Sequence, residues 1–233
     1  MALDVMPRIA YLAHRYGGYV PLSRLNTVSR YIDKKARTIL DIGCNDGITM
    51  LFLNRRKRYR ATGVDISAEA VRVASARKTH DAYITGNVLD LPFNEHSYDL
   101  VLSMQMLEHL DKEDGYALID KMEKTARRQV IITTPVGFHE LLDHPGTGGA
   151  DHKSGWSVDE FHKRGYTVKG NKLRIERYAG NIIYKHTPWL APVHSAFWLT
   201  LGVILAPLPY YFPGIFAFDM VCVKDLDAGG QPG

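Results

Sequence analysis

The chain has 233 residues, of which 45% are hydrophobic and 23% are charged. This composition is typical of a folded protein, and it excludes disordered, collagen-like and disulfide-rich classes. The length suits one domain with a full core. The net charge of +4 is too small to indicate a nucleic-acid partner. Two distant cysteines, Cys44 and Cys222, favour a reducing compartment and no zinc site.

The N-terminal segment lacks the features of a signal peptide. Asp4, Pro7 and Arg8 stand where a signal peptide needs its apolar core, so the default location is the cytoplasm. Residues 1–36 precede the first expected sheet strand and are predicted to form a helical cover, with residues 22–34 as its clearest helix.

Apolar runs then alternate with amphipathic stretches. Strands are expected at residues 38–43, 60–67, 82–87, 98–105 and 128–135, with helices at 48–56, 68–78 and 112–126 between them. Two further strands are expected at residues 166–175 and 216–226. The alternation predicts an α/β fold: a Rossmann-like, doubly wound, mostly parallel seven-stranded sheet with helices on both faces.

The boundaries of this single domain follow from that pattern. After the helical cover of residues 1–36, residues 37–186 form the Rossmann-like core. An apolar insertion occupies residues 187–217, and residues 218–233 hold the last strand and the tail.

The sequence ILDIGCNDG, residues 39–47, joins the first strand to its helix. In an open parallel sheet, ligands bind beyond the carboxyl ends of the strands, where the strand order reverses. Gly43 and Gly47 allow a sharp turn and a close approach of the backbone, and the following helix offers unpaired N–H groups to a ligand. Tight turns without a ligand also use glycine, so the turn alone leaves both readings open.

Asp65 is the second marker of a ligand site. It ends the second expected strand, 18 residues after Gly47 and 22 after Gly43. An acidic residue at about this distance from a glycine turn is placed to accept hydrogen bonds from ribose hydroxyls. Capping of the next helix is the alternative, although Ser67 suits that role better. The two features together predict an adenosine-type ligand.

The motifs resemble those of class I S-adenosylmethionine-dependent methyltransferases. GCNDG, residues 43–47, is similar to the GxGxG turn of that family, with Asn45 at the middle glycine. The stretch GNVLDLPFNEHSYDLVLSMQMLEHL, residues 86–110, resembles the family's next motif, and the resemblance covers roughly residues 37–137. Residues 133–138 and 152–168 are similar to a bacterial and archaeal branch. A nicotinamide dinucleotide site would need the GxGxxG fingerprint, which Asn45 interrupts.

The resemblance implies S-adenosyl-L-methionine as the cofactor. Asp41 would orient its ammonium end, and Asn87 stands where the family commonly has an aspartate near the adenine amine. The cofactor-binding residues implied are Asp41, Gly43, Cys44, Asn45, Gly47, Asp65, Ile66, Asn87, Val88 and Met104.

Two histidines are the catalytic candidates. His109 follows Glu108 just beyond the fourth strand, near the expected methyl group, where a base could take a proton from a hydroxyl or amine acceptor. The alternative is that His109 and Glu108 brace the loop and contact no substrate. His152 belongs to a glycine-rich stretch, residues 143–156, expected to form a lid with Trp156, which could equally be a packing anchor.

Four histidines fall in one short interval and raise the question of a metal ion. His139, His144, His152 and His162 are spaced by five, eight and ten residues, which matches no standard site. The sequence therefore predicts no bound metal.

The apolar insertion is the last feature. Residues 187–218 contain no Asp, Glu, Lys or Arg, but five prolines interrupt them, and the longest proline-free segment has 14 residues. A helix of that length is shorter than the ~20 residues needed to span a bilayer. The insertion is expected to form an apolar helix and an irregular aromatic arm. Four roles of the insertion stay open: it packs on the rest of the fold, covers the acceptor pocket, docks on a partner, or contacts a membrane interface.

These features predict an enzyme that transfers a methyl group in line to a small or lipid-like acceptor. A methyltransferase-like binding subunit, which holds a partner or membrane through residues 187–217, is the alternative from another class. A protein or RNA methyltransferase stays open, although no basic surface interleaved with aromatic residues is visible.

Overall fold

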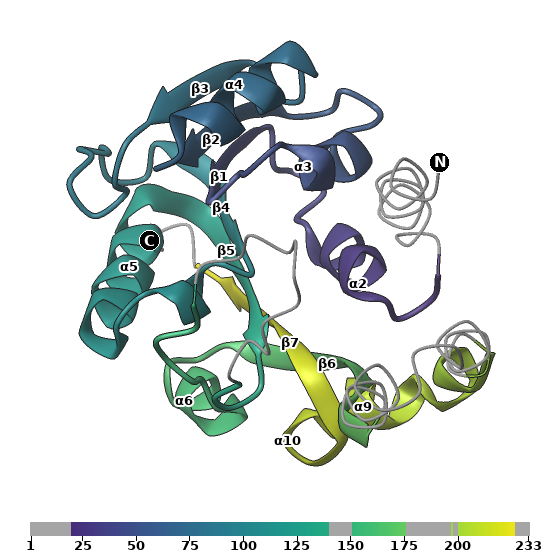
Figure 1. Cartoon of the computed structure of the whole chain (residues 1–233). Helices are drawn as coiled ribbons and strands as arrows, with labels where there is room; N and C mark the ends of the chain where they lie inside the picture. Colours follow the sequence, from purple (N-terminus) through teal and green to yellow (C-terminus); the bar gives the residue numbers. More distant parts are fainter. Residues whose placement is uncertain (1–19, 140–150, 176–196, 198–199, 227–233) are drawn as a thin grey trace, which may run out of the picture.

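A computed structural model describes residues 20–139, 151–175, 197 and 200–226. Its centre is one seven-stranded sheet in the order β3-β2-β1-β4-β5-β7-β6, which crosses the molecule with helices on either side (Figure 1). The strands are β1 (Thr38–Ile42), β2 (Arg60–Asp65), β3 (Ala82–Thr85), β4 (Tyr98–Met104), β5 (Ala126–Pro135), β6 (Thr167–Leu173) and β7 (Ala217–Asp225).

The sheet is parallel from β3 to β5 and antiparallel at β7 and β6. The predicted Rossmann-like, mostly parallel architecture is thus confirmed. Strand β1 lies between β2 and β4, with Ile42 opposite Val64 on one side and Ser103 on the other. The strand order reverses between β1 and β4, so the carboxyl ends of these two strands form the switch point of the sheet.

Helices cover the two faces of the sheet and bury two separate apolar clusters. On one face, α2 (Arg24–Tyr31) and α3 (Ile48–Leu53) pack on alternate strand residues such as Ile39, Leu100 and Leu102. On the other face, α5 (Lys112–Thr125) and α6 (Val158–Lys163) pack on the residues between them, such as Leu40 and Val101. Because side chains alternate along a strand, both faces of the central strands are buried, as expected for a parallel sheet.

Local signals explain where several helices begin. Ser23, Ser67 and Ser157 are the N-caps of α2, α4 (Ala68–Ala76) and α6, and each side-chain oxygen accepts a hydrogen bond from the third backbone N–H of its helix. Only α2 is described within the expected helical cover, because residues 1–19 lie outside the described part of the chain.

The expected helix at residues 48–56 is shorter in the structure. Helix α3 ends at Leu53, because the Asn54 side chain accepts from the backbone N–H of Tyr59 (3.1 Å) and donates to its carbonyl (2.8 Å). These two hydrogen bonds hold the chain in a turn that leads directly into β2. The prediction of a helix through Arg56 was therefore wrong by one turn.

The described end of the apolar insertion is helical rather than irregular. Two short helices, α9 (Pro207–Tyr211) and α10 (Pro213–Phe216), each begin at a proline, which is favoured at the first helical position. Pro209 O lies 2.1 Å from the position that a Cβ on Gly170 of β6 would occupy, so α9 packs directly on the sheet edge. Among the described helices, none has the length and apolar character needed to cross a bilayer.

Candidate functional site

The turn after β1 is held against β2 by backbone hydrogen bonds. The N–H groups of Gly43 and Cys44 both donate to Val64 O, at 2.8 and 3.0 Å. Gly43 (φ 73°), Asn45 (φ 47°) and Gly47 (φ 75°) all have left-handed backbone conformations. Glycine adopts this region without steric cost, and asparagine is among the residues that tolerate it best. Asn45 therefore takes a conformation that a glycine at the same position would favour.

Gly47 is also required by its neighbours. A Cβ on this residue would lie 2.1 Å from Thr79 Oγ1 and 2.7 Å from Thr79 Cβ. Gly47 is the N-cap of α3, so the close packing of Thr79 fixes the start of that helix beside the turn. On the other side of the turn, a Cβ on Gly43 would lie 2.8 Å from Met106 Cγ. Met106 thus brings the segment after β4 against the segment after β1.

A buried polar network lies beneath the turn. His80 Nε2 donates to Asp41 Oδ2 at 3.0 Å, and His80 Nδ1 lies 2.7 Å from the Thr79 hydroxyl. Asp41 is 3% exposed and His80 is 7% exposed. The network therefore links the carboxylate at the end of β1 to the residue that packs on Gly47.

Asp65 joins the ends of β1 and β2. Its Oδ2 accepts from the backbone N–H of Asn45 at 2.8 Å, and its Oδ1 accepts from the N–H of Ser67 at 2.9 Å. Each carboxylate oxygen has two lone pairs, so both oxygens retain capacity for ribose hydroxyls. Ile66 follows with 73% of its surface exposed, which places an uncovered apolar side chain beside the carboxylate.

Cys44 lies on the inner side of the turn. Its sulfur lies 2.9 Å from the position that a Cβ on Gly63 of β2 would occupy, and the residue is 5% exposed. Burial, reinforced by the negative charges of Asp41 and Asp65, raises the pKa of the thiol to about 12. The side chain is therefore a neutral packing group at physiological pH, without thiolate reactivity.

The remaining predicted cofactor residues lie at the ends of β3 and β4. Asn87 is exposed after β3, and its Oδ1 accepts from the N–H of Leu89 at 3.1 Å. Val88 is buried, and Met104 is half-buried at the end of β4. The fold thus brings all ten predicted cofactor residues to the carboxyl ends of β1 to β4.

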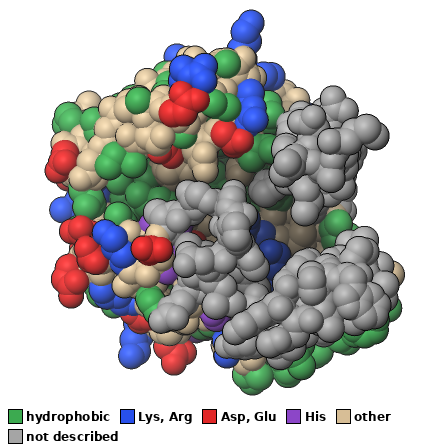
Figure 2. All heavy atoms as spheres, in the orientation of Figure 1, with side chains coloured by type: hydrophobic (Ala, Val, Ile, Leu, Met, Phe, Trp, Pro, Cys, Tyr) green, Lys and Arg blue, Asp and Glu red, His purple; other side chains and the backbone are tan. Residues whose placement is uncertain are grey.

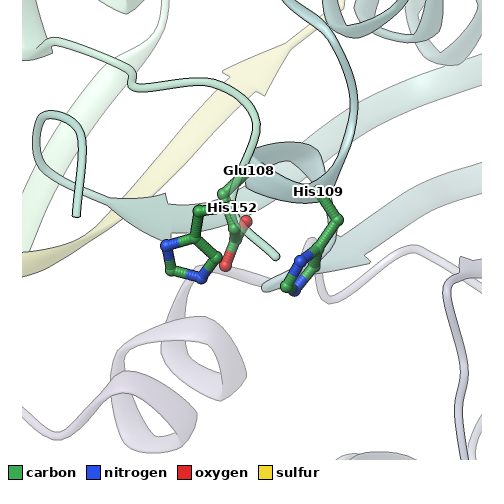
Figure 3. Close-up of side chains that lie close together, drawn as sticks. All are labelled: Glu108, His109 and His152. Atoms are coloured by element: carbon green, nitrogen blue, oxygen red, sulfur yellow. The ribbon is translucent and has the colours of Figure 1, made fainter. Parts of the chain in front are cut away.

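The two catalytic candidates meet on the same side of the sheet, beyond β4. The short 3₁₀ helix η1 (Leu107–His109) presents Glu108 and His109, and His152 approaches from the segment before α6 (Figure 3). The imidazole rings of His109 and His152 have centroids 5.0 Å apart. Glu108 O accepts hydrogen bonds from the N–H groups of Lys153 (2.8 Å) and Ser154 (3.1 Å), which hold the His152 segment against η1.

Glu108 is a buried carboxyl group with 2% exposure. Its Oε2 accepts from Thr134 Oγ1 at 3.1 Å. Desolvation raises the pKa of Glu108 to about 7 against the lowering effect of its hydrogen bonds, and the charge of Asp219 raises it further. Arg24, which acts in the opposite direction, is itself paired with Asp219 at 3.4 Å.

Trp156 is a packing anchor and not a residue of a lid. Its ring is 1% exposed and contacts Gly115 of α5, where an added Cβ would lie 2.4 Å from the indole. The Lys112 ammonium group lies 3.6 Å from the indole centroid, and the indole N–H donates to Ser154 Oγ at 3.0 Å. Most of the predicted lid, including His144, lies outside the described residues. Of the other histidines in that interval, His162 is exposed on α6.

Two residues of this region were not predicted from the sequence: His80 pairs with Asp41 across 39 residues, and Met106 packs on Gly43. Glu108 was expected only as a residue that could brace the loop, and the structure places it beside both catalytic candidates. Glu108 and His109 are adjacent in the sequence, but His152 is 43 residues further along the chain, so only the fold brings the three together.

The strand order, the left-handed turn and the carboxylate at the end of β2 define a Rossmann-like protein with a ligand site at its switch point. Residues 39–129 match the family model described as "Methyltransferase domain". Over this matched segment, which holds the turn after β1 and Asp65, the chain resembles the class I S-adenosylmethionine-dependent methyltransferases.

Curated relatives share part of their length with this chain. It is 35% identical over 116 residues to ajmaline N-methyltransferase of Rauvolfia serpentina, which covers 47% of this chain and 39% of the relative. It is 29% identical over 161 residues to the ubiquinone biosynthesis O-methyltransferase of Serratia proteamaculans (strain 568), covering 59% of this chain and 66% of the relative. The chain thus spans less than two thirds of the length of these relatives.

Solved structures share the fold over most of the chain. A putative methyltransferase in complex with the Haloferax volcanii Trm112 methyltransferase activator matches with a TM-score of 0.59 and 18% identity, covering 96% of this chain and 97% of the other. A SAM-dependent methyltransferase from Archaeoglobus fulgidus matches with a TM-score of 0.57 and 15% identity, covering 90% and 94%.

Proposed function

We propose that the protein is a methyltransferase that uses S-adenosyl-L-methionine to methylate a small or lipid-like acceptor. The observation that carries this proposal is the hydrogen bond that connects the turn after β1 to the end of β2 at the switch point. Asp65 at the end of β2 accepts the N–H of Asn45, and three residues of the turn have left-handed conformations. The two curated relatives support the reaction class, because the name of each describes a methyltransferase of small-molecule metabolism.

The residues at this site fit an adenosyl ligand. Gly43 and Gly47 keep Cβ atoms away from the turn, so that the backbone can approach the ligand closely. The carboxylate of Asp65 can accept from the ribose hydroxyls, and the exposed face of Ile66 can cover the adenine ring. Asn87 offers an amide to the ring edge, and Asp41 orients the ammonium end of the ligand while His80 holds its carboxylate.

The acceptor side lies beyond β4. Bound S-adenosylmethionine supplies an activated methyl group on a sulfonium, which leaves as a neutral thioether. Met106 links η1 to the Gly43 turn, and His109 and His152 lie together beside η1, which supports an acceptor position next to these two histidines. These two histidines act on the acceptor, whose hydroxyl or amine proton must be lost during transfer.

The test is a turnover assay with purified full-length protein, S-adenosylmethionine and a panel of phenols, amines and isoprenoid quinols. Mass spectrometry should detect S-adenosylhomocysteine with at least one acceptor, and the Asp65→Ala variant should lose this product. Binding of S-adenosylhomocysteine without turnover on any acceptor class would favour the methyltransferase-like binding subunit instead.

One observation favours contact with a membrane through the apolar insertion. Ile204, Tyr211 and Ile215 are 70%, 64% and 66% exposed, and green apolar side chains gather along the lower edge of the molecule in Figure 2, over α9 and α10. Lys169 lies beside this surface, with its ammonium group 5.0 Å from the Tyr210 ring centroid. Apolar side chains beside a cation are typical of contact with an anionic lipid interface.

This contact can be tested by sedimentation with vesicles. The wild-type protein should bind vesicles that contain phosphatidylglycerol more strongly than pure phosphatidylcholine vesicles. A Tyr211→Ser/Ile215→Ser variant should lose most of this binding, whereas Phe138→Ser, which removes a 55% exposed side chain elsewhere, should retain it. Equal binding by both variants would contradict a role for α9 and α10.

A further inference from the structure

Three side chains beyond β4 offer metal-ligand atoms to a common point. A carboxylate oxygen of Glu108 and one nitrogen each of His109 and His152 all lie within 4.8 Å of one another (Figure 3). The residues come from two segments 43 residues apart, which the hydrogen bonds from Lys153 and Ser154 to Glu108 O hold together. Their arrangement is thus part of the fold and not a chance meeting of surface groups.

The hydrogen bonds of both histidines fix the same tautomer. His109 Nδ1 lies 3.2 Å from Asp151 O, and His152 Nδ1 lies 2.7 Å from His139 O. A carbonyl oxygen only accepts, so both Nδ1 atoms carry the hydrogen, and in a neutral imidazole the lone pair is then on Nε2. Histidines that bind metal ions usually donate their other ring N–H to a carbonyl or carboxylate in this way.

Glu108 supplies the negative charge. Its carboxyl group is 2% exposed, and within the described ranges no Lys or Arg side chain forms an ion pair with it. A buried carboxylate is costly without a compensating positive charge, and a divalent cation between it and two neutral imidazoles would provide that charge. The Thr134 hydroxyl, 3.1 Å from Oε2, would then orient the carboxylate as a supporting hydrogen-bond donor.

We propose that Glu108, His109 and His152 bind one divalent transition-metal ion, with Zn²⁺ as the first candidate. Two imidazoles and one carboxylate are ligands that Zn²⁺, Co²⁺ and Fe²⁺ prefer, whereas Mg²⁺ and Ca²⁺ prefer oxygen ligands. Bonds of 2.0–2.1 Å in tetrahedral geometry need ligand atoms roughly 3.4 Å apart, so small side-chain rotations close the site. This inference departs from the sequence prediction that no metal is bound.

Three protein ligands leave a coordination position open. This part of the inference rests on the proposed function: an acceptor oxygen in that position would lose its proton more readily, because the ion stabilises the negative oxygen. In that case His109 and His152 act through the ion, and the expected acceptor is one with a hydroxyl group.

Metal binding can be measured without any methyl transfer. Full-length protein is stripped with a chelator, exchanged into clean buffer, and titrated with ZnCl₂ by calorimetry and with CoCl₂ by visible absorption. We expect one equivalent of each ion, with the d–d bands of Co²⁺ in a site of low coordination number. The His109→Gln and His152→Gln variants should each weaken Zn²⁺ binding by at least about tenfold, because even the loss of a residue that only orients a ligand commonly has an effect of this size.

His162→Gln is the matched control, because His162 is exposed on α6 and away from the cluster. It should bind Zn²⁺ as the wild type does. The test rests on the two histidine variants, because His109 and His152 are only half-buried and their replacement should leave the protein folded, as circular dichroism checks. Any of three results would overturn the proposal. The wild type binds neither Zn²⁺ nor Co²⁺, the histidine variants bind Zn²⁺ as tightly as the wild type, or the wild type binds only Mg²⁺. Calorimetry with S-adenosylhomocysteine on the same samples tests the proposed function separately.

Discussion

His80 donates a hydrogen bond from Nε2 to the Asp41 carboxylate at 3.0 Å, and both side chains are shielded from solvent. Asp41 lies on β1, whereas His80 lies in the loop between α4 and β3, so the bond connects β1 to a loop that leads into a strand two positions away in the sheet. The carboxylate that the family resemblance assigns to the cofactor is therefore positioned by a residue outside the family motifs.

His80→Ala should destabilise the fold by roughly 2–4 kcal/mol, because it leaves a buried carboxylate without its hydrogen-bond donor. Urea unfolding measures this loss, and His162→Ala serves as the exposed control. In a double-mutant cycle with Asp41→Asn, the two changes should be coupled by about 1–3 kcal/mol. Additive effects would show that the hydrogen bond contributes little.

Gly47→Ala should be more damaging than Gly137→Ala. Both glycines have positive φ (75° and 86°), so both substitutions carry the left-handed cost of about 1–2 kcal/mol. Only at Gly47 does the new methyl group overlap Thr79, which adds roughly 1–3 kcal/mol, while nothing lies within 4 Å of a Cβ at Gly137. Urea midpoints compare the two variants, and equal losses would contradict the packing argument.

Asp65→Ala should weaken binding of S-adenosylhomocysteine by roughly 10- to 100-fold, because a hydrogen bond to a charged group contributes about 1.5–3 kcal/mol. The substitution also removes the acceptor of the Asn45 N–H. Thermal unfolding of the same variant therefore has to show that it is folded at the temperature of the titration. Glu95→Gln changes an exposed residue just before the amino end of β4, whereas the ligand site lies at the carboxyl ends, so it should leave the affinity unchanged.

Glu160 should make stability depend on pH in the acid range. Burial raises its pKa, but hydrogen bonds from Lys112 (2.6 Å), Tyr116 (2.7 Å) and Ser157 outweigh that effect and lower it to about 2. Because the folded pKa lies below the unfolded value of ~4.3, the ionised group stabilises the fold above that pH, and this is lost as the pH falls toward 2.

The comparison with Glu160→Gln isolates this contribution from those of other carboxylates. At pH 6 the free energy of unfolding of the wild type should exceed that of the variant by about 1 kcal/mol, after allowance for solvent screening of a partly exposed group. That difference should shrink between pH 4.5 and 2. A constant difference across this range, measured by urea unfolding, would rule out the ionised pair as its source.

The sheet and the ligand turn could be predicted because their signals are local. Strand runs such as that of β4 show in the apolar pattern, and Gly43 and Gly47 mark positive φ directly. The end of α3 was mispredicted because Asn54 binds Tyr59 by a side-chain contact that periodicity does not register. The helices α9 and α10 were missed because proline was taken as a break, although it also begins helices.

In the candidate site, too, the features with local sequence signals could be predicted, and those that depend on distant contacts could not. Its backbone turn and Asp65 follow from spacing along one βαβ unit. The roles of His80 and Glu108 depend on contacts between segments about 40 residues apart, which only the folded chain defines. The sequence left two roles for Trp156, a lid residue or a packing anchor. Its contact with Gly115 of α5 shows that it packs in the core.

The central claim is that the ends of β1 and β2 together bind an adenosyl group. Isothermal titration of the folded protein with S-adenosylhomocysteine tests it most directly. We expect saturable one-to-one binding, which Asp65→Ala weakens. No heat with S-adenosylhomocysteine, together with ready binding of a nicotinamide dinucleotide, would contradict it.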